Sequence, residues 1–309
     1  MANSIDYVAR YLPLMDEKYV AECKTSILEN NGNVIPGAQE NEFKVAKLDM
    51  DALGDFDRKS GYTEGNTSLT WETIKCDKER SQTLRVDRLD NQESMDQAYG
   101  KLASEFMRTR VTPETDAARI SKIASTEGIS AITETIADGA ALVKSLRKGT
   151  NVMDEDEVYE DDRVLLITPT LHDMLEDMDT TKSKEIKNRF SAIIRVPAKR
   201  MYKGITLNNG KENAYGFSVD GATPINFMIV DKGAVAVGMS QYLKYFTPDQ
   251  DQIGDSHVFK YRNNNLYGYV FENKVAGVYV SFKDVEETTP EVTPEETVPE
   301  ETVPEETQG

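Results

Sequence analysis

Residues 43–89 alternate apolar and polar positions in the way that extended β-strands do. The clearest runs are Phe43-Lys-Val-Ala-Lys-Leu-Asp-Met50, Ser68-Leu-Thr-Trp-Glu-Thr-Ile-Lys75 and Thr83-Leu-Arg-Val-Asp87. A polar, glycine-marked segment at 57–66 separates the first two runs and is expected to form an exposed tip. Because one ribbon cannot cover its own apolar face, the pattern predicts a long hairpin that needs a neighbour for stability.

Helical spacing replaces this alternation after residue 90. Asp90 or Asn91 is a suitable cap for a helix whose stripe consists of Met95, Tyr99, Leu102, Phe106 and Arg110. A second helix is predicted to start with Thr112 as its N-cap and Pro113 in its first turn, and to end before Gly128. A third is predicted over residues 129–148, where Gly149 would end it.

From residue 150 onwards, short apolar runs are mixed with helical segments. An acidic loop at 154–162 precedes a buried strand, Arg163-Val-Leu-Leu-Ile-Thr-Pro169, and a helix through Leu171, Leu175 and Met178 follows. Further strands are predicted at 192–196, 225–230, 234–237, 256–261, 268–271 and 275–282. Strands and helices that are partly segregated along the chain indicate an α+β fold.

The two ends of the chain lack a core pattern of their own. Residues 1–40 hold one helical spacing, interrupted by Pro13, and are expected to form an arm that runs over another surface; its apolar positions are Tyr7, Tyr11, Leu14, Met15 and Tyr19. Residues 284–309 hold ten acids and no Lys or Arg, and repeat Pro-Glu-Glu-Thr three times. Proline and repelling charges oppose packing, so we expect a disordered tail that solubilises the protein or serves as a tether.

Composition narrows the class of protein. The chain has 309 residues, 39% of them hydrophobic, which is enough for about two globular units. Its 54 acidic and 36 basic residues give a net charge of -18, which argues against non-specific binding to a phosphate backbone. Two cysteines, no secretory signal and no apolar stretch of about 18 residues indicate a soluble protein made in a reducing cytoplasm.

The residue sets that catalysis or metal binding require are not found at the necessary spacing. His172 and His257 have no cysteine or carboxylate at zinc-ligand spacing, and three aspartate-rich stretches lack the final glutamate of an EF-hand. No phosphate-binding loop, dinucleotide fingerprint or Gly-x-Ser-x-Gly elbow occurs. We expect no catalytic residue, cofactor or metal site; a metal-dependent hydrolase using the acidic loop at 154–162 is a remote alternative.

The predicted tip of the ribbon holds a small basic and aromatic cluster in an otherwise acidic chain. Arg58, Lys59 and Tyr62 form this cluster. Subunits of like charge need local complementarity to associate in a fixed register, so we expect it to dock on an acidic surface of a neighbouring subunit. Together with Trp71 on the following strand, these residues are the candidates for an intersubunit contact.

Four stretches carry a family resemblance through their order and spacing. They are Gly61-Tyr-Thr-Glu-Gly65 leading to Trp71-Glu-Thr, Arg85-Val-Asp-Arg-Leu-Asp-Asn-Gln-Glu93, Phe106-Met-Arg-Thr-Arg-Val-Thr-Pro-Glu-Thr-Asp-Ala-Ala-Arg119, and a run from Phe246-Thr-Pro-Asp through Tyr261-Arg262 to Glu272-Asn-Lys-Val-Ala-Gly-Val-Tyr279. Together they resemble the major capsid proteins of tailed double-stranded DNA bacteriophages. Encapsulin shells and the floor domain of herpesvirus capsids share that fold.

The resemblance implies how the chain is divided. Residues 1–40 would be the N-terminal arm and 41–90 an extended β-hairpin loop that reaches across a neighbouring subunit. Residues 91–127 and 241–283 would form a peripheral domain with a long spine helix near 92–110, and residues 128–240 an axial domain. The acidic tail at 284–309 is not part of the family pattern. The arm is too short for the scaffolding segment of many relatives, which implies a separate scaffold protein.

The implied function is that of a non-enzymatic shell subunit that forms pentamers and hexamers around double-stranded DNA. Its implied partners are further copies of the chain, a scaffold protein, a portal and decoration proteins, and no membrane. An acidic wall encloses DNA without adhering to it, because it repels phosphate. The protein would reside in the virion capsid, and in the host cytoplasm during assembly. An encapsulin-type bacterial compartment is the alternative within the same fold.

Overall fold

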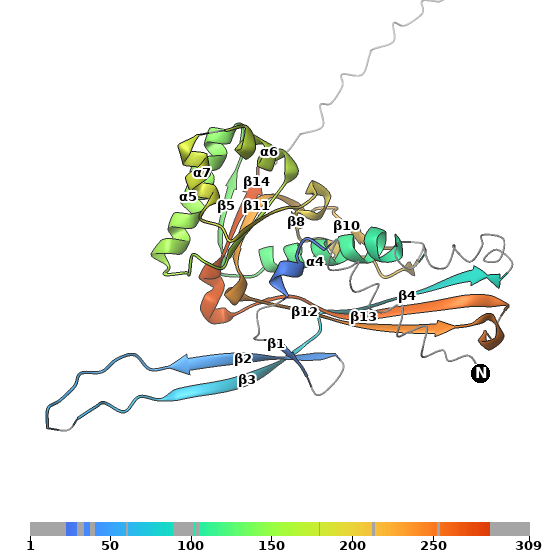
Figure 1. Ribbon diagram of the computed structural model, residues 1–309, viewed down its shortest axis with the longest axis horizontal. Coiled ribbons are helices and arrows are strands. Elements are labelled where there is room, and N and C mark those ends of the chain that lie inside the picture. The colour runs from blue at the N-terminus through green and yellow to red at the C-terminus, as the bar shows by residue number, and fades with distance from the viewer. Residues whose placement is uncertain are drawn as a thin grey trace, which may run out of the picture.

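The structure is a computed structural model, and it describes residues 23–29, 34–37, 41–59, 61–88, 102, 105–178, 180–211, 214–251 and 254–284. Figure 1 shows a globular part, a long sheet beside it and a projecting two-stranded ribbon. The ribbon consists of β2 (Glu42–Met50) and β3 (Thr67–Lys75), with the short β1 (Val34–Pro36) pairing to β2.

A six-stranded sheet forms the centre of the globular part. Its order is β5 (Ser130–Glu134), β14 (Val278–Lys283), β11 (Thr223–Asp231), β6 (Arg163–Ile167) and β7 (Ala192–Arg195), and the short β8 (Tyr202–Lys203) also pairs with β11. The pairs β5–β14 and β6–β7 are parallel, whereas the pairs that β11 makes are antiparallel. Strand β6 is buried at every position, which explains its continuous apolar run.

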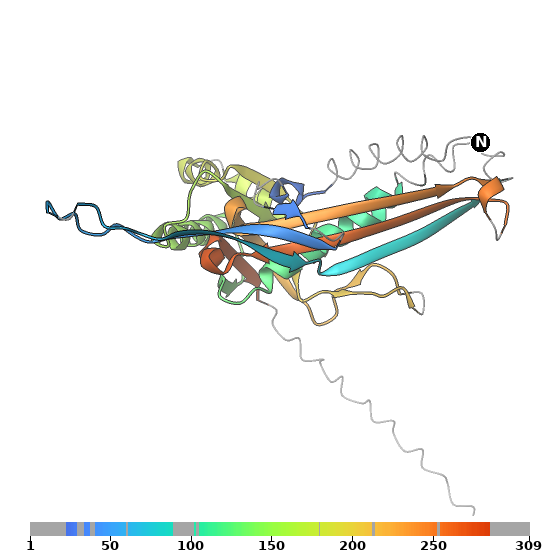
Figure 2. The same cartoon turned by 90° about the horizontal axis from the view of Figure 1, so that it is seen from below.

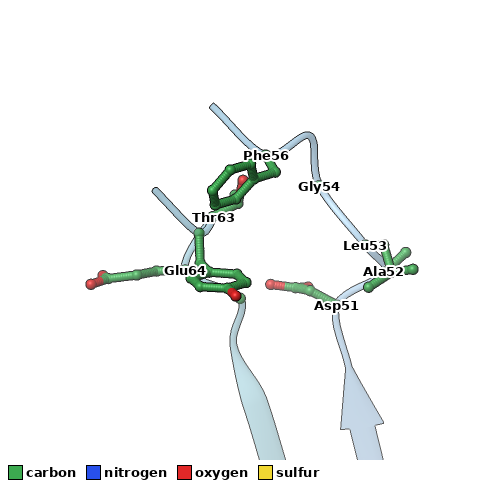
Figure 3. A pocket seen from close by; sticks show the side chains of 9 residues that line it. Asp51, Ala52, Leu53, Gly54, Phe56, Thr63 and Glu64 are labelled. Atoms are coloured by element: carbon green, nitrogen blue, oxygen red, sulfur yellow. The ribbon is translucent and has the colours of Figure 1, made fainter. Parts of the chain in front are cut away.

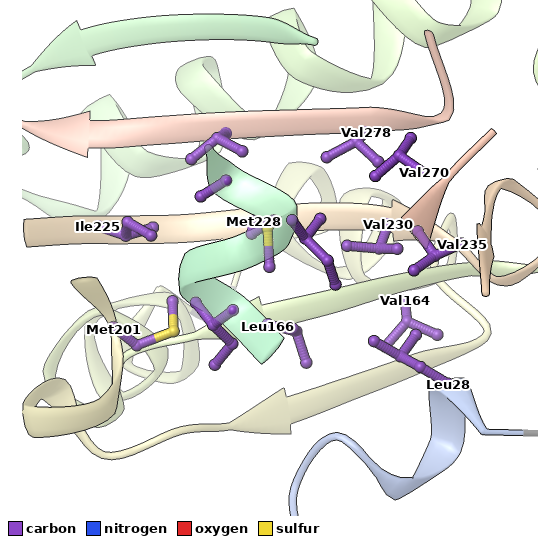
Figure 4. Packing of buried hydrophobic residues seen from close by; sticks show 14 of the residues in the cluster. Leu28, Val164, Leu166, Met201, Ile225, Met228, Val230, Val235, Val270 and Val278 are labelled. Atoms are coloured by element: carbon purple, nitrogen blue, oxygen red, sulfur yellow. The ribbon is translucent and has the colours of Figure 1, made fainter. Parts of the chain in front are cut away.

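Alternate residues of β6 face two different cores, because successive side chains of a strand point to opposite faces. Leu165 and Ile167 join the core beneath three helices, α5 (Gly139–Glu155), α6 (Pro169–Asp177) and α7 (Thr181–Lys187). Val164 and Leu166 join the other core, which Figure 4 shows together with Met228 and Val230 of β11. Ile120 of α4 (Thr112–Ala124) belongs to the same core.

A three-stranded antiparallel sheet extends beside the globular part, as Figure 2 shows. Its strands are β12 (Val235–Phe246), β13 (Ser256–Val270) and β4 (Lys78–Asp87), with β13 in the middle. A π-helical turn at Met107–Val111 packs against Phe259 and Tyr261 of β13 and runs directly into α4. One continuous helical element therefore contacts both sheets. A small hairpin, β9 (Thr206–Leu207) and β10 (Phe217–Ser218), completes the described strands.

The predicted α+β class and most of the predicted strands are confirmed. The hairpin of β2 and β3, the buried strand β6 and the helix α6 lie where the pattern placed them. The two runs at 256–261 and 268–271 are parts of the single strand β13. Strand β14, which the resemblance groups with the rest of 241–283, lies in the six-stranded sheet beside β5 and β11.

The helix predicted over residues 129–148 is wrong at both ends. Its first residues form β5, which pairs in parallel with β14. Helix α5 begins at Gly139, where the Asp138 carboxylate accepts a hydrogen bond from the Ala141 N–H at 2.7 Å, and it continues past Gly149. A Cβ at position 149 would lie 2.8 Å from the Tyr279 ring, so this glycine permits close packing and does not end the helix.

Two further expectations are corrected. Thr112 is not an N-cap, because the helix already runs through Val111 and both residues have helical backbone angles. The run that starts at Thr83 leaves the ribbon, since β4 pairs with β13 along its whole length. The helix near 92–110 lies largely outside the described residues, and the helical spacing within 7–19 and the tail from residue 285 lie wholly outside them.

Candidate assembly interface

The base of the ribbon is fixed to the body by one apolar face. Phe43 and Val45 of β2 are 5% and 1% exposed, and they pack in a cluster with Leu266 and Phe271. A Cβ at position 238 of β12 would lie 2.9 Å from the Phe43 ring, so Gly238 lets the two strands approach this closely. The ribbon therefore leaves the body in a defined direction.

Polar contacts reinforce the base. The Tyr269 hydroxyl of β13 donates to the Glu72 carboxylate of β3 at 3.4 Å. Burial, and after it Glu72, raises the pKa of Tyr269, so its hydroxyl keeps the proton that it donates. Burial, and after it Asp77, also raises the pKa of the Cys76 thiol, which directly follows β3. A neutral thiol at this position is a poor nucleophile, which fits a structural role.

Beyond the base, the other face of the ribbon carries exposed apolar side chains. The antiparallel register places Ala46 opposite Trp71 and Leu48 opposite Leu69, with Met50 two residues further along β2. Opposed and alternate residues share a face, so these five side chains form one surface, named the apolar stripe. Their exposed fractions are high: 46% for Trp71, 51% for Leu48, 58% for Leu69 and 64% for Met50. Contiguous exposed apolar surface of this kind marks an interaction site.

Of the members of the apolar stripe, only Trp71 was expected from the sequence at an intersubunit contact. A change of phase in the apolar pattern could have revealed the others. In β2 the buried apolar positions are 43 and 45, whereas Ala46 is half-buried and Leu48 and Met50 are exposed, so the apolar set moves from odd to even numbers. In β3 the same change separates Ile74 at the base from Leu69 and Trp71. Since the two faces alternate, the change marks where contact with the subunit's own body ends.

The tip of the ribbon, at residues 51–66, is a loop closed by its own hydrogen bonds. The Asn66 N–H donates to the Asp51 carboxylate at 2.8 Å, and the Asp51 N–H donates to the Asn66 carbonyl at 3.1 Å. A hollow of about 280 Å³ lies between the two sides of the loop. Figure 3 shows the Asp51 side chain pointing across this opening, whereas Leu53 points away from it.

The predicted basic and aromatic cluster sits at the outer end of this tip. Arg58, Lys59 and Tyr62 are all exposed, and the Tyr62 ring meets Phe56 edge to face with centroids 5.2 Å apart. These three residues lie in or directly beside the turn closed by the Asp57–Gly61 bridge, whereas Trp71 lies apart from them, in the middle of β3. The same tip also carries four acidic residues, namely Asp51, Asp55, Asp57 and Glu64. Only its outermost turn is therefore basic.

The described residues hold no group of three or more His, Cys, Asp and Glu side chains that could bind a metal ion. In the acidic stretch at 154–162, Asp154 is instead paired with two cations. Its carboxylate lies 2.6 Å from the fully buried Arg163 and 3.1 Å from Arg189. The Arg163 Nε also donates to the Tyr159 carbonyl at 3.0 Å, so this stretch is anchored structurally.

Among the residues that the structure describes, no helix combines the length and the apolar character that a bilayer crossing requires.

No protein-family model and no curated protein matches this chain. Solved structures do match it over most of its length. The capsid of the cyanophage P-SCSP1u is 13% identical with a TM-score of 0.54, covering 81% of this chain and 85% of that one. The capsid of an empty GTA particle is 12% identical with a TM-score of 0.54, covering 81% and 87%. A virus-like particle from Pyrococcus furiosus is 13% identical with a TM-score of 0.52, covering 86% and 98%.

These likenesses define the class of fold. The chain has the fold of phage capsid proteins, as the four stretches of sequence resemblance predict. At 12% to 13% identity the similarity concerns the fold alone.

Proposed function

We propose that this chain is the major capsid protein of a tailed bacteriophage or prophage. It acts as a structural, non-enzymatic subunit that assembles into the pentamers and hexamers of an icosahedral-type shell around double-stranded DNA. The apolar stripe carries the proposal, because four of its side chains are 46% to 64% exposed on the ribbon, which projects from the body. Burying one large apolar side chain fully is worth about 1.5–3 kcal/mol, so a second copy that covers the stripe gains stability.

The remaining parts take the roles that the resemblance implies. Residues 1–40 serve as the arm and 41–90 as the extended loop, whose tip residues Arg58, Lys59 and Tyr62 contact a neighbour together with Trp71. Residues 91–127 and 241–283 belong to the peripheral domain and residues 128–240 to the axial domain. Two strand pairings cross these bounds, since β4 pairs with β13 and β14 pairs with β5 and β11. The partners are a scaffold protein, a portal, decoration proteins and the enclosed DNA. The subunit resides in the virion capsid after assembly in the host cytoplasm.

Electron microscopy combined with size-exclusion chromatography and light scattering tests the proposal. The protein, expressed alone or with its scaffold, is expected to form capsomers or shells. A folded monomer at every concentration and salt, with or without scaffold, would contradict it.

The contents of particles from the native source distinguish the two kinds of shell that share this fold. DNA inside supports a virion, whereas a protein cargo without DNA supports an encapsulin-type compartment, which the mostly phage-derived neighbours do not favour.

A further inference from the structure

The edge of the six-stranded sheet at which β14 ends is rich in cations. The segment Arg195-Val-Pro-Ala-Lys-Arg-Met-Tyr-Lys203 holds four basic residues and no acidic one. Arg200 pairs with the buried Asp116 at 2.8 Å. Within the described ranges, Arg195, Lys199 and Lys203 have no carboxylate at ion-pair distance. These three residues are named the cationic edge.

The cationic edge lies beside the point where the chain leaves the sheet. The register places Arg195, Ile167, Phe227 and Ser281 in one row across β7, β6, β11 and β14. Neighbouring strands are about 4.8 Å apart, so this row spans roughly 14 Å. Lys203 is closer still, because its Nζ lies 5.0 Å from the centre of the Phe282 ring. Strand β14 ends one residue later.

The segment that follows has the opposite charge. Residues 284–309 contain ten acids and no Lys or Arg. An extended chain rises about 3.1 Å per residue, so even the first few acidic residues can reach the cations. Because the segment is covalently attached, its effective concentration at the edge is in the millimolar range.

We propose that the acidic Pro-Glu-Glu-Thr tail binds the cationic edge of its own subunit and thereby withholds this edge from other polyanions. The partner is identified by charge complementarity and by the place where the chain exits. The proposal concerns one subunit and does not depend on shell formation. It gives the repeats, which the capsid fold does not account for, a binding surface within the same chain.

Cleavage of the tail in the full-length protein by a glutamate-specific protease tests this proposal. The comparison is between the unmodified chain and the variant Arg195→Glu, Lys199→Glu, Lys203→Glu at low salt. Loss of three exposed ion pairs predicts cleavage that is faster by about fivefold to tenfold in the variant. Raising the salt to about 0.5 M is expected to accelerate cleavage of the unmodified chain and to abolish the difference.

The matched control is Lys78→Glu, Lys244→Glu, Lys260→Glu, which changes the net charge equally at three exposed residues of the three-stranded sheet. Its tail is expected to be cleaved at the unmodified rate. Lys203 stacks on Phe282, so its replacement could lower the melting temperature of the triple variant. In that case the double variant Arg195→Glu, Lys199→Glu is used instead, and its tail is expected to be cleaved about threefold faster than that of the unmodified chain. Three results would each overturn binding within one subunit. The edge variant could be cleaved at the same rate as the unmodified chain, or the control could be accelerated as much as the edge variant. The protection of the tail could also disappear when the protein is diluted.

Discussion

The buried carboxylate of Asp116 in α4 accepts a hydrogen bond from Arg200 Nη1 at 2.8 Å. Its other oxygen accepts bonds from the Thr25 N–H at 3.0 Å and the Thr25 hydroxyl at 2.7 Å. One side chain thus joins α4, the segment before β8 and the described N-terminal residues 23–29. Arg119, one turn further along α4 and fully buried, lies 2.6 Å from Glu29 and strengthens the same junction.

Replacing Asp116 by Ala is expected to destabilise the subunit by about 3–5 kcal/mol, because it leaves Arg200 and the Thr25 donors without their buried acceptor. Urea unfolding of dissociated subunits measures the loss. The control is Glu185→Gln, which removes an exposed partner of Arg147 at 3.2 Å and is expected to change stability by less than about 1 kcal/mol. A loss of similar size in both variants would mean that the junction contributes no more than surface charge.

The apolar stripe predicts a separation between folding and assembly. The double variant Leu48→Ser, Trp71→Ser is expected to fold normally, since both side chains are exposed in the single subunit. Its assembly is expected to require at least about tenfold more protein, because each side chain loses burial of roughly 1 kcal/mol or more at an interface. Light scattering measures the concentration dependence. The control, Ser68→Ala with Thr70→Ala, alters the opposite face of β3 and is expected to assemble normally.

The basic turn at the tip predicts a salt-dependent contribution to assembly. The variant Arg58→Glu, Lys59→Glu is expected to fold, because both residues are exposed, and to assemble several-fold more slowly with a reduced dependence on salt. The variant Lys244→Glu, Lys260→Glu changes the charge equally on the three-stranded sheet and serves as the control. If the tip variant keeps its yield and its salt dependence, Arg58 and Lys59 are solvated charges without a partner.

Tyr279 predicts how stability depends on alkaline pH. Burial, and after it Glu134, raises the pKa of Tyr279 to about 12, whereas an unfolded tyrosine titrates near 10. Between these values the unfolded chain has released the proton and the folded chain has kept it, so stability falls as pH rises from about 10 to about 12. Tyr279→Phe is expected to make that fall shallower.

The same variant also tests the environment of the hydroxyl, which is buried without a hydrogen-bond partner among the described residues. At pH 7, Tyr279→Phe is expected to leave stability unchanged or to raise it by up to about 1 kcal/mol. The control is Tyr215→Phe, which alters an exposed hydroxyl. Denaturant unfolding at several pH values measures both effects, and a loss above about 1 kcal/mol at pH 7 would show that the hydroxyl has a partner.

Local pattern determined much of the fold. Alternation at 43–50 and 68–75 predicted the hairpin of β2 and β3, and the continuous apolar run at 164–167 predicted the buried strand β6. Residue order and spacing also predicted the capsid fold, through the family resemblance. For the interface, charge and aromatic content singled out Arg58, Lys59 and Tyr62, and their contact with a neighbour stays a prediction. The strand predictions succeed because the period of a strand is set by residues that are adjacent in the chain.

Tertiary structure alone decided which partner each segment takes. The run at 83–87 alternates like a ribbon strand, yet it pairs with residues of β13 that are 169 to 177 positions further along the chain. Residues 130–134 suit a helix or a strand, and the exposed edge of β14 makes them a strand. The Asp116 junction joins positions that are 84 to 93 residues apart in the chain. The side chains of the apolar stripe resemble core residues in the sequence, and they are exposed because the ribbon extends past the body of the subunit. Pairing and burial depend on contacts between distant residues, so periodicity along the chain does not encode them.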